Sequence, residues 1–370
     1  MNPTLIHGTV DPKFAKVKEA FASSFADGLE HGAAVALMID GKLVVDLWGG
    51  HANKAKTKPW GRETIANVWS TTKGVMALGV AMMVERGKLA YDKPIASIWP
   101  EFAAGGKEHV TLNDVMSHTS GLNGVNVPIS EEELCAWTPY VNALAAMKPN
   151  WNPGEHCAYH ALTYGHLTGE PLRRVAGKSV ADEIAGPLGV EFFIGVPEKH
   201  DHRATEMIDG PACSDWLKQV LSTSFPQSCK NPTPVATSPN KRSWRAAEIP
   251  GGNGHSDARS LATIYADICG RNSKLISAAG RQEASHVRFR GEDESFASPT
   301  VWGAGFRLED DEYGVRASKQ TIGHGGWGGT MAFGDPEARL GFAYVTNNML
   351  GFETRDPRRE RLVEAVYNAL

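Results

Sequence analysis

Paired cysteines, long apolar runs and an excess of positive charge are all missing from this sequence. The five cysteines among 370 residues are odd in number and scattered, which argues against a disulfide framework and is typical of a reducing compartment. No apolar run approaches the ~20 residues that a membrane-spanning helix needs. The net charge is −4, and no basic run is interleaved with aromatic residues, so nothing supports binding to nucleic acid or to an anionic membrane.

Residues 1–12 also lack the pattern of a secretory signal, in which a basic segment precedes about 7–15 apolar residues. We therefore expect a cytoplasmic protein. Enzymes that build or guard a cell wall act outside the cytoplasm, so such a role is less expected. The sequence leaves a homo-oligomer open.

The chain contains enough apolar material for two packed lobes. Hydrophobic residues make up 42% and charged residues 22%, which is typical of a globular protein, and 370 residues exceed one ordinary core. Helical spacing of apolar residues and short β-branched runs predict its elements. The predicted helices are 13–30, 70–87, a short one opened by a capping box at 111–114, 130–147, 159–175, 256–268 and 358–370; the predicted strands are 34–39, 43–48, 303–308, 314–321, 329–333 and 340–346.

These elements predict an α+β fold. An Asp-Gly turn at 40–41 joins the first two strands into a hairpin. Early and late strands most simply join in one antiparallel sheet of about five strands, flanked by the terminal helices. We expect this α/β sandwich lobe to comprise residues 1–75 and 255–370. Residues 76–254 would form a mainly helical lobe with a long loop over 220–254, and the active site would lie at the interface.

The motif S-x-x-K stands at 70–73, at the start of an apolar predicted helix. Residues three apart share one helix face, so the Ser70 hydroxyl and the Lys73 amine can reach the same space. A serine hydroxyl is a poor nucleophile until a base takes its proton, and S-x-x-K is a signature of penicillin-recognising serine enzymes. A lysine with an ordinary pKa of about 10.4 acts as a base only where burial favours its neutral form. A helix-capping serine beside a solvated lysine is the alternative.

Two further motifs follow in order, Y-H-A at 159–161 and G-H-G-G-W-G-G at 323–329. The stretches S-H-T-S-G-L at 117–122 and W-N-P-G at 151–154 accompany them. With these motifs the chain, over nearly its whole length, resembles the serine β-lactamase-like hydrolases. It is most similar to the family VIII carboxylesterases, relatives of class C β-lactamases and DD-peptidases. The resemblance implies a β-lactamase-like fold.

The resemblance also implies roles for residues of all three motifs. Ser70 would be the nucleophile. Tyr159 would place its phenol against Lys73, so that the pair titrates as a unit and either member takes the serine proton. The backbone N–H groups of Ser70 and Trp327 would form the oxyanion hole. The substrate site would be lined by His324, Gly325, Gly326 and Trp327, and neither a cofactor nor a metal is implied.

Two positions depart from the β-lactamase pattern. Ala161 stands where these enzymes usually carry Asn, so no side-chain amide is available to an acylamino group. His324 stands where Lys is common, and histidine is mostly neutral at pH 7. Both changes favour uncharged esters over anionic β-lactams. We therefore expect a serine carboxylesterase for small, short-chain esters that works through an acyl-enzyme. The alternatives are amide hydrolysis of the β-lactamase or DD-peptidase type, acyl transfer at the same site, and a silent ligand-binding homologue.

Three further patterns are weaker evidence of a functional site. Histidines and a cysteine lie close together over 156–166, but no second half-site has metal-ligand spacing, so we expect no metal. The stretch 254–258 resembles a G-x-S-x-G elbow without its last glycine, and we expect a turn with a helix-capping serine. Trp244, Trp302 and Trp327 are candidates for an apolar wall around an acyl group, with ordinary packing as the alternative.

Overall fold

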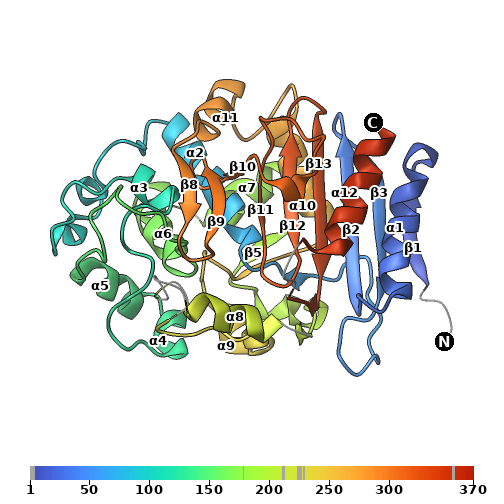
Figure 1. The fold of residues 1–370 in the computed structure, drawn as a ribbon, viewed down its shortest axis with the longest axis horizontal. Helices are drawn as coiled ribbons and strands as arrows, with labels where there is room; N and C mark the ends of the chain where they lie inside the picture. Colours follow the sequence, from blue (N-terminus) through green and yellow to red (C-terminus); the bar gives the residue numbers. More distant parts are fainter. Residues whose placement is uncertain (1–4, 178, 211–212, 223–226, 228–229, 352–354) are drawn as a thin grey trace.

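The protein combines twelve described α-helices with one large antiparallel sheet (Figure 1). The computed structural model describes residues 5–177, 179–210, 213–222, 227, 230–351 and 355–370. The α-helices are α1 (Ala15–Ala26), α2 (Thr71–Glu85), α3 (Leu112–Met116), α4 (Glu131–Cys135), α5 (Thr138–Ala146), α6 (Thr163–Ala176), α7 (Val180–Leu188), α8 (Cys213–Leu221), α9 (Arg242–Ala246), α10 (Ala258–Cys269), α11 (Ala278–Ala284) and α12 (Pro357–Ala369). The strands are β1 (Ile6–Val10), β2 (Gly32–Ile39), β3 (Lys42–Gly50), β4 (Ala66–Asn67), β5 (Phe192–Ile194), β6 (Ile208–Asp209), β7 (Gly254–Ser256), β8 (Phe289–Asp293), β9 (Ser298–Trp302), β10 (Arg307–Leu308), β11 (Ile322–Gly325), β12 (Met331–Asp335), β13 (Leu340–Thr346) and β14 (Asn348–Met349).

Early and late strands of the chain meet in the main sheet. Its nine strands run in the order β1-β3-β2-β13-β12-β11-β10-β9-β8, and each neighbouring pair is antiparallel. β2 pairs with β13 from Ala33↔Thr346 to Ile39↔Leu340. The predicted α+β class with a shared antiparallel sheet is confirmed, but about five strands was too few. The edge strands β1 and β8 were missed because most of their side chains are exposed, so they lack a buried alternating pattern.

Side chains alternate across the sheet and divide the apolar core in two. Val35 and Leu37 of β2 pack with α1 and α12, which lie side by side over one face of the sheet (Figure 1). Ala34 and Ala36 point the other way, into a larger core with α2 and α10. Every residue of α2 from 71 to 83 is buried, as expected of a helix that is apolar on all sides. This burial gives the S-x-x-K motif a rigid support.

Two predicted elements are wrong in the C-terminal half of the sequence. Residues 314–321 form turns instead of a strand, because the Ala317 N–H bonds to the Gly314 carbonyl and the Thr321 N–H to the Ser318 carbonyl. The segment predicted as a loop over 220–254 contains α9 and a short 3-10 helix, Ser238–Asn240. Part of that segment, including Cys229, lies outside the described residues.

Two predicted helices have different bounds. The helix expected over 130–147 is divided into α4 and α5 at Trp137, whose φ of +66° does not continue a right-handed helix. The helix expected over 159–175 begins only at Thr163, so Tyr159 lies in the preceding loop. Among the described residues, no helix is both long enough and apolar enough to cross a membrane.

Candidate active site

Ser70 stands at a sharp bend between β4 and α2. The preceding Trp69 has a φ of +45°, a conformation that a residue other than glycine keeps only when its surroundings hold it. Asn67 Oδ1 accepts a hydrogen bond from the Trp69 N–H (3.1 Å), and the Thr72 hydroxyl donates to the Trp69 carbonyl. The Gly254 N–H donates to Thr72 Oγ1 (2.8 Å). These bonds fix the bend that presents Ser70 to solvent at the start of α2.

Lys73 is fully buried beneath Ser70, and three oxygens surround its Nζ. The distances are 3.0 Å to Ser70 Oγ, 2.7 Å to the Ala161 carbonyl and 2.6 Å to the Gly251 carbonyl. Since carbonyls only accept, they take two Nζ hydrogens whether the group is an ammonium or an amine. The third position faces Ser70, where an ammonium donates and an amine directs its lone pair at the hydroxyl. The geometry suits removal of the serine proton.

Tyr159 lies in the loop before α6, with its ring centre 4.7 Å from Lys73 Nζ. Asp293, at the end of β8, supports this loop by accepting hydrogen bonds from the Tyr159 N–H (3.2 Å) and the Ser295 N–H (2.9 Å). Burial raises the pKa of Asp293 to about 6, against the opposing effect of these N–H donors. Sequence reasoning missed Asp293, which belongs to no motif and to a strand that was not predicted.

Three buried histidines lie around Tyr159, and backbone groups determine which ring nitrogen carries the proton. His118 Nδ1 accepts from the His160 N–H (3.0 Å), so the proton of His118 is on Nε2. The Nδ1 atoms of His160 and His324 lie 2.7 Å and 2.6 Å from backbone carbonyl oxygens, so these atoms donate. Burial lowers the pKa of both His160 and His324 to about 3, and the charge of Lys73 acts in the same direction. His324 is therefore neutral at physiological pH.

The third motif forms a tight turn between β11 and β12. The Gly329 N–H donates to the Gly326 carbonyl (3.1 Å), and Gly328 has a φ of +85°, as in a type II turn. Trp327 occupies the second position of this turn. Its ring packs edge-on against that of Trp69, with the ring centres 4.9 Å apart. The turn and the bend before Ser70 are therefore neighbours.

Gly326 permits this close approach. A Cβ at this position would lie 2.4 Å from the Val68 carbonyl oxygen and 3.0 Å from Thr71 Oγ1, on the two sides of Ser70 in the chain. The first of these contacts is too short for a Cβ and the second is tight, so any side chain would push the turn away from Ser70. Glycine brings the strand edge as near to the serine as the backbone allows.

A cavity of about 540 Å³ opens where these elements meet. Its lining includes the predicted residues Ser70, Tyr159, His324, Gly325, Gly326 and Trp327. Lys73, the remaining predicted residue, lies beneath Ser70. Of the three tryptophans considered for an acyl wall, Trp327 alone is in the described lining; Trp302 stacks behind Tyr159 and Trp244 packs against Trp69.

Charged side chains that belong to no motif also line this cavity. Each arginine there lies near a carboxylate: Arg307 is 2.9 Å from Asp310, Arg355 is 2.9 Å from Asp311, and Arg359 is 3.9 Å from Asp356. Arg307 and Arg355 are thus each offset by a carboxylate, whereas Asp356 also pairs with the buried Arg358 at 2.7 Å. Sequence reasoning missed them because they come from separate segments that converge only in the folded chain.

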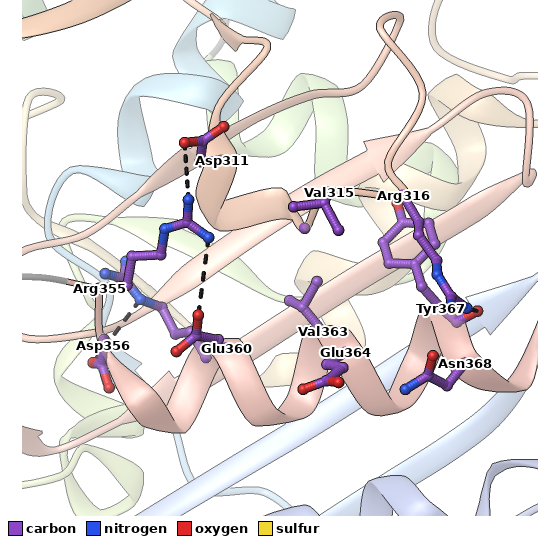
Figure 2. Close-up of a pocket in the computed structure, with 12 residues that line it drawn as sticks. Asp311, Val315, Arg316, Arg355, Asp356, Glu360, Val363, Glu364, Tyr367 and Asn368 are labelled. Atoms are coloured by element: carbon purple, nitrogen blue, oxygen red, sulfur yellow. Dashed lines mark hydrogen bonds and ion pairs between the residues drawn. The ribbon is translucent and has the colours of Figure 1, made fainter.

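A smaller cavity of about 210 Å³ lies beside the first, between residues 311–316 and α12. Figure 2 shows Val315 and Val363 facing one another across it. The two cavities share Arg355, Asp356 and Arg359. The smaller one contains no motif residue, so the larger one is the candidate site. Within the described ranges, no group of three or more His, Cys, Asp or Glu side chains is arranged to hold a metal ion.

Known proteins are similar to this chain over most of its length. A family model described as Beta-lactamase matches residues 20–367. Esterase/beta-lactamase LipL of Mycobacterium tuberculosis is 32% identical over 368 residues, covering 93% of this chain and 83% of that protein. A crystal structure of a family VIII carboxylesterase aligns with a TM-score of 0.91 and 38% identity, over 99% of this chain and 100% of the other. A penicillin-binding protein homologue from Caulobacter crescentus aligns with a TM-score of 0.90 and 36% identity, over 99% and 100%. The predicted β-lactamase-like fold is confirmed.

Proposed function

The chain belongs to the beta-lactamase family, and we propose that it is a serine carboxylesterase that cleaves small, short-chain esters through an acyl-enzyme on Ser70. The observation that carries this proposal is the position of Lys73 Nζ, 3.0 Å from Ser70 Oγ, with two backbone carbonyls holding its other hydrogens. This arrangement gives the hydroxyl the base that it needs before it can attack a carbonyl carbon. The names of the esterase relatives support the same reaction class.

In the proposed cycle, Ser70 Oγ attacks the ester carbonyl carbon while the pair of Lys73 and Tyr159 takes the hydroxyl proton. The pair returns this proton to the leaving alcohol as the ester C–O bond breaks, and the acyl group remains on Ser70. A water molecule that gives its proton to the pair then attacks the acyl-enzyme. The carboxylic acid leaves, and Ser70 regains its proton.

The negative charge that develops on the substrate oxygen needs two donors already in place. We propose that these are the N–H groups of Ser70 and Trp327. Ser70 is the N-cap residue of α2, where the helix dipole favours an anion. Trp327 is held in the turn that lines the same cavity. His324, Gly325 and Gly326 would form the adjoining wall of the substrate site.

The substrate preference follows from the charge of the lining. His324 is buried with a pKa of about 3, so it offers no positive charge to a carboxylate at pH 7. Ala161 offers no side-chain amide, and its backbone carbonyl accepts from Lys73. Arg307 and Arg355 are each paired with a carboxylate at 2.9 Å. An uncharged ester therefore fits this lining better than an anionic β-lactam.

An intact-mass measurement tests the proposal. The protein is incubated with an aryl organophosphonate, and Ser70→Ala serves as the matched control. We expect one adduct on the wild-type protein, none on S70A, and turnover of p-nitrophenyl acetate and butyrate only by the wild type. Neither adduct nor ester turnover on the wild type would refute the enzyme and leave a silent ligand-binding homologue.

Hydrolysis of β-lactams is the second candidate, and the name of the LipL relative favours it. The same preparation is assayed with nitrocefin. We expect weak or no cephalosporin turnover, and nitrocefin turnover faster than that of the short esters would reverse the assignment. Adding an alcohol and analysing the products separates hydrolysis from acyl transfer, which would form a new ester.

We propose further that the cavity lies between a lobe of residues 1–75 and 255–370 and a lobe of residues 76–254, and that the enzyme acts in the cytoplasm. The nine-stranded sheet, which draws its strands only from the first of these two parts, supports the division. Limited proteolysis tests it: because α2 around 75 and β7 around 255 are buried, the first cuts should fall in exposed loops of residues 76–254 and leave the sheet intact, and early cuts within the sheet would contradict the division.

A further inference from the structure

We infer that Arg358 is a positioning residue that holds the turn carrying the Trp327 N–H; the inference rests on the proposed oxyanion role of Trp327. Arg358 is the second residue of α12 and is fully buried. Its Nη2 donates to the carbonyl of Gly328, the third residue of the turn (2.7 Å). Its Nη1 donates to the carbonyl of Asn348 in β14 (2.8 Å). One side chain therefore connects α12 to the turn that lines the candidate site.

Two buried carboxyl groups hold the guanidinium in place. Asp356, which Figure 2 shows at the start of α12, accepts from Nη2 (2.7 Å), from Nε (3.1 Å) and, as the N-cap, from the Arg358 backbone N–H (3.0 Å). Glu30 lies 3.7 Å from Nη1 and accepts hydrogen bonds from the hydroxyls of Tyr344 and Thr346. The planar fork of arginine is used on several sides at once, which a lysine cannot reproduce.

The turn is shaped around this guanidinium. A Cβ on Gly329 would lie 2.2 Å from Arg358 Nη2 and 2.8 Å from Asp356 Oδ2, so glycine makes room for the ion pair. Gly328 and Gly329 have φ values of +85° and +125°. Two consecutive glycines give the turn little rigidity of its own. Arg358, which is not among the residues that line the cavity, supplies that rigidity as a clamp, through its bond to the Gly328 carbonyl.

The clamp matters for the reaction because an oxyanion donor must be in place before charge develops. Such donors act at about 2.7–3.1 Å from the oxyanion, and a loose donor loses most of its effect. Gly328 directly follows Trp327, so a displacement of the Trp327 N–H moves the Gly328 carbonyl as well. That movement stretches the bonds to Arg358 and to the Leu350 N–H (3.3 Å).

The test compares Arg358→Lys with Arg203→Lys. Arg203 also forms a two-pronged pair with a carboxylate, Glu191, but neither residue lines the cavity. For R358K we expect kcat on p-nitrophenyl acetate to fall about 10- to 100-fold, less than the ~10²–10³ for removing a donor outright. KM should change by less than about twofold, because the donor acts mainly in the transition state. Hydrogen exchange in residues 326–330 should become faster. R203K should change none of the three.

The hydrogen-exchange result tests whether Arg358 holds the turn, and the kcat result tests whether this matters for the reaction. Unchanged exchange in R358K would refute the clamp. Faster exchange with unchanged kcat would refute the positioning role, and so would an equal loss in R203K. If R358K fails to fold, Asp356→Asn replaces it, since the amide keeps the shape but can accept on only one oxygen. If the wild-type protein shows neither ester turnover nor a phosphonate adduct, the proposed function fails, whereas the exchange comparison still decides whether Arg358 holds the turn.

Discussion

A single methyl group on Gly326 tests whether the third motif must lie as close to Ser70 as it does. In Gly326→Ala the new Cβ would stand 2.4 Å from the Val68 carbonyl oxygen. Non-bonded atoms settle at about 3.5 Å, so the turn has to move by about 1 Å. A misplacement of that size costs about 10²-fold in rate when it affects reacting groups, and the strain costs about 1–3 kcal/mol of stability.

The measurement is kcat and KM on p-nitrophenyl butyrate together with the midpoint of thermal unfolding. Gly186→Ala is the control, because Gly186 lies inside α7 and, its chain neighbours aside, nothing lies within 4 Å of the added Cβ. There the substitution should leave kcat unchanged. No gain in stability is expected, because Pro187 follows and its ring disfavours helical backbone at a preceding residue with a Cβ. A G326A enzyme with kcat/KM within about twofold of the wild type would refute the reasoning, because it would mean that the turn does not position the reaction.

Three further predictions concern single side chains. Burial raises the pKa of Glu30 from 4.5 to about 8, so the folded state binds this proton more tightly than the unfolded state does. The free energy of unfolding should therefore fall as the pH rises from about 4.5 to 8. Urea titrations across this range should show that Glu30→Gln removes the decline, and the same decline in the variant as in the wild type would contradict the prediction. Asp293→Ala leaves the Tyr159 N–H without its acceptor and should cost about 1–3 kcal/mol and lower kcat, whereas Asp293→Asn keeps an acceptor oxygen and should retain most activity. Lys73→Met should slow phosphonate labelling of Ser70 by about 10²–10⁴-fold, and labelling at the wild-type rate would show that Lys73 is not the base.

Local signals in the sequence predicted local structure well. The turn at Asp40 and Gly41 has positive φ at both residues, as the Asp-Gly pair predicts, and Gly87 follows α2 with a φ of +69°. Thr111 and Asp114 form the predicted capping box with reciprocal hydrogen bonds. Each of these features depends on neighbours within four residues. The prediction of a strand over 314–321 was wrong because a residue distant in the sequence helps to hold its turns: Asp335 Oδ2 accepts from the Ser318 N–H (3.0 Å).

The candidate site likewise contains residues that could be predicted from local spacing and residues that could not. Ser70 and Lys73 are three residues apart, so their contact could be predicted from helix geometry alone. The position of Tyr159 and of the Gly326 turn came from the order of motifs in the resemblance, and the structure places both beside Ser70. Asp293 and Arg358 could not be predicted, because each acts on a motif through a backbone contact between distant segments. Such contacts leave no spacing in the sequence.

The pairing of β2 with β13 has a consequence for how the enzyme becomes active during synthesis. Ser70 leaves the ribosome well before the turn at Trp327 and before β13, the strand that joins this turn's part of the sheet to β2. A nascent chain that ends before β13 therefore contains Ser70 but lacks the strand that joins the turn at Trp327 to β2. We expect the proposed oxyanion donor to be fixed beside Ser70 only when β13 enters the middle of the sheet.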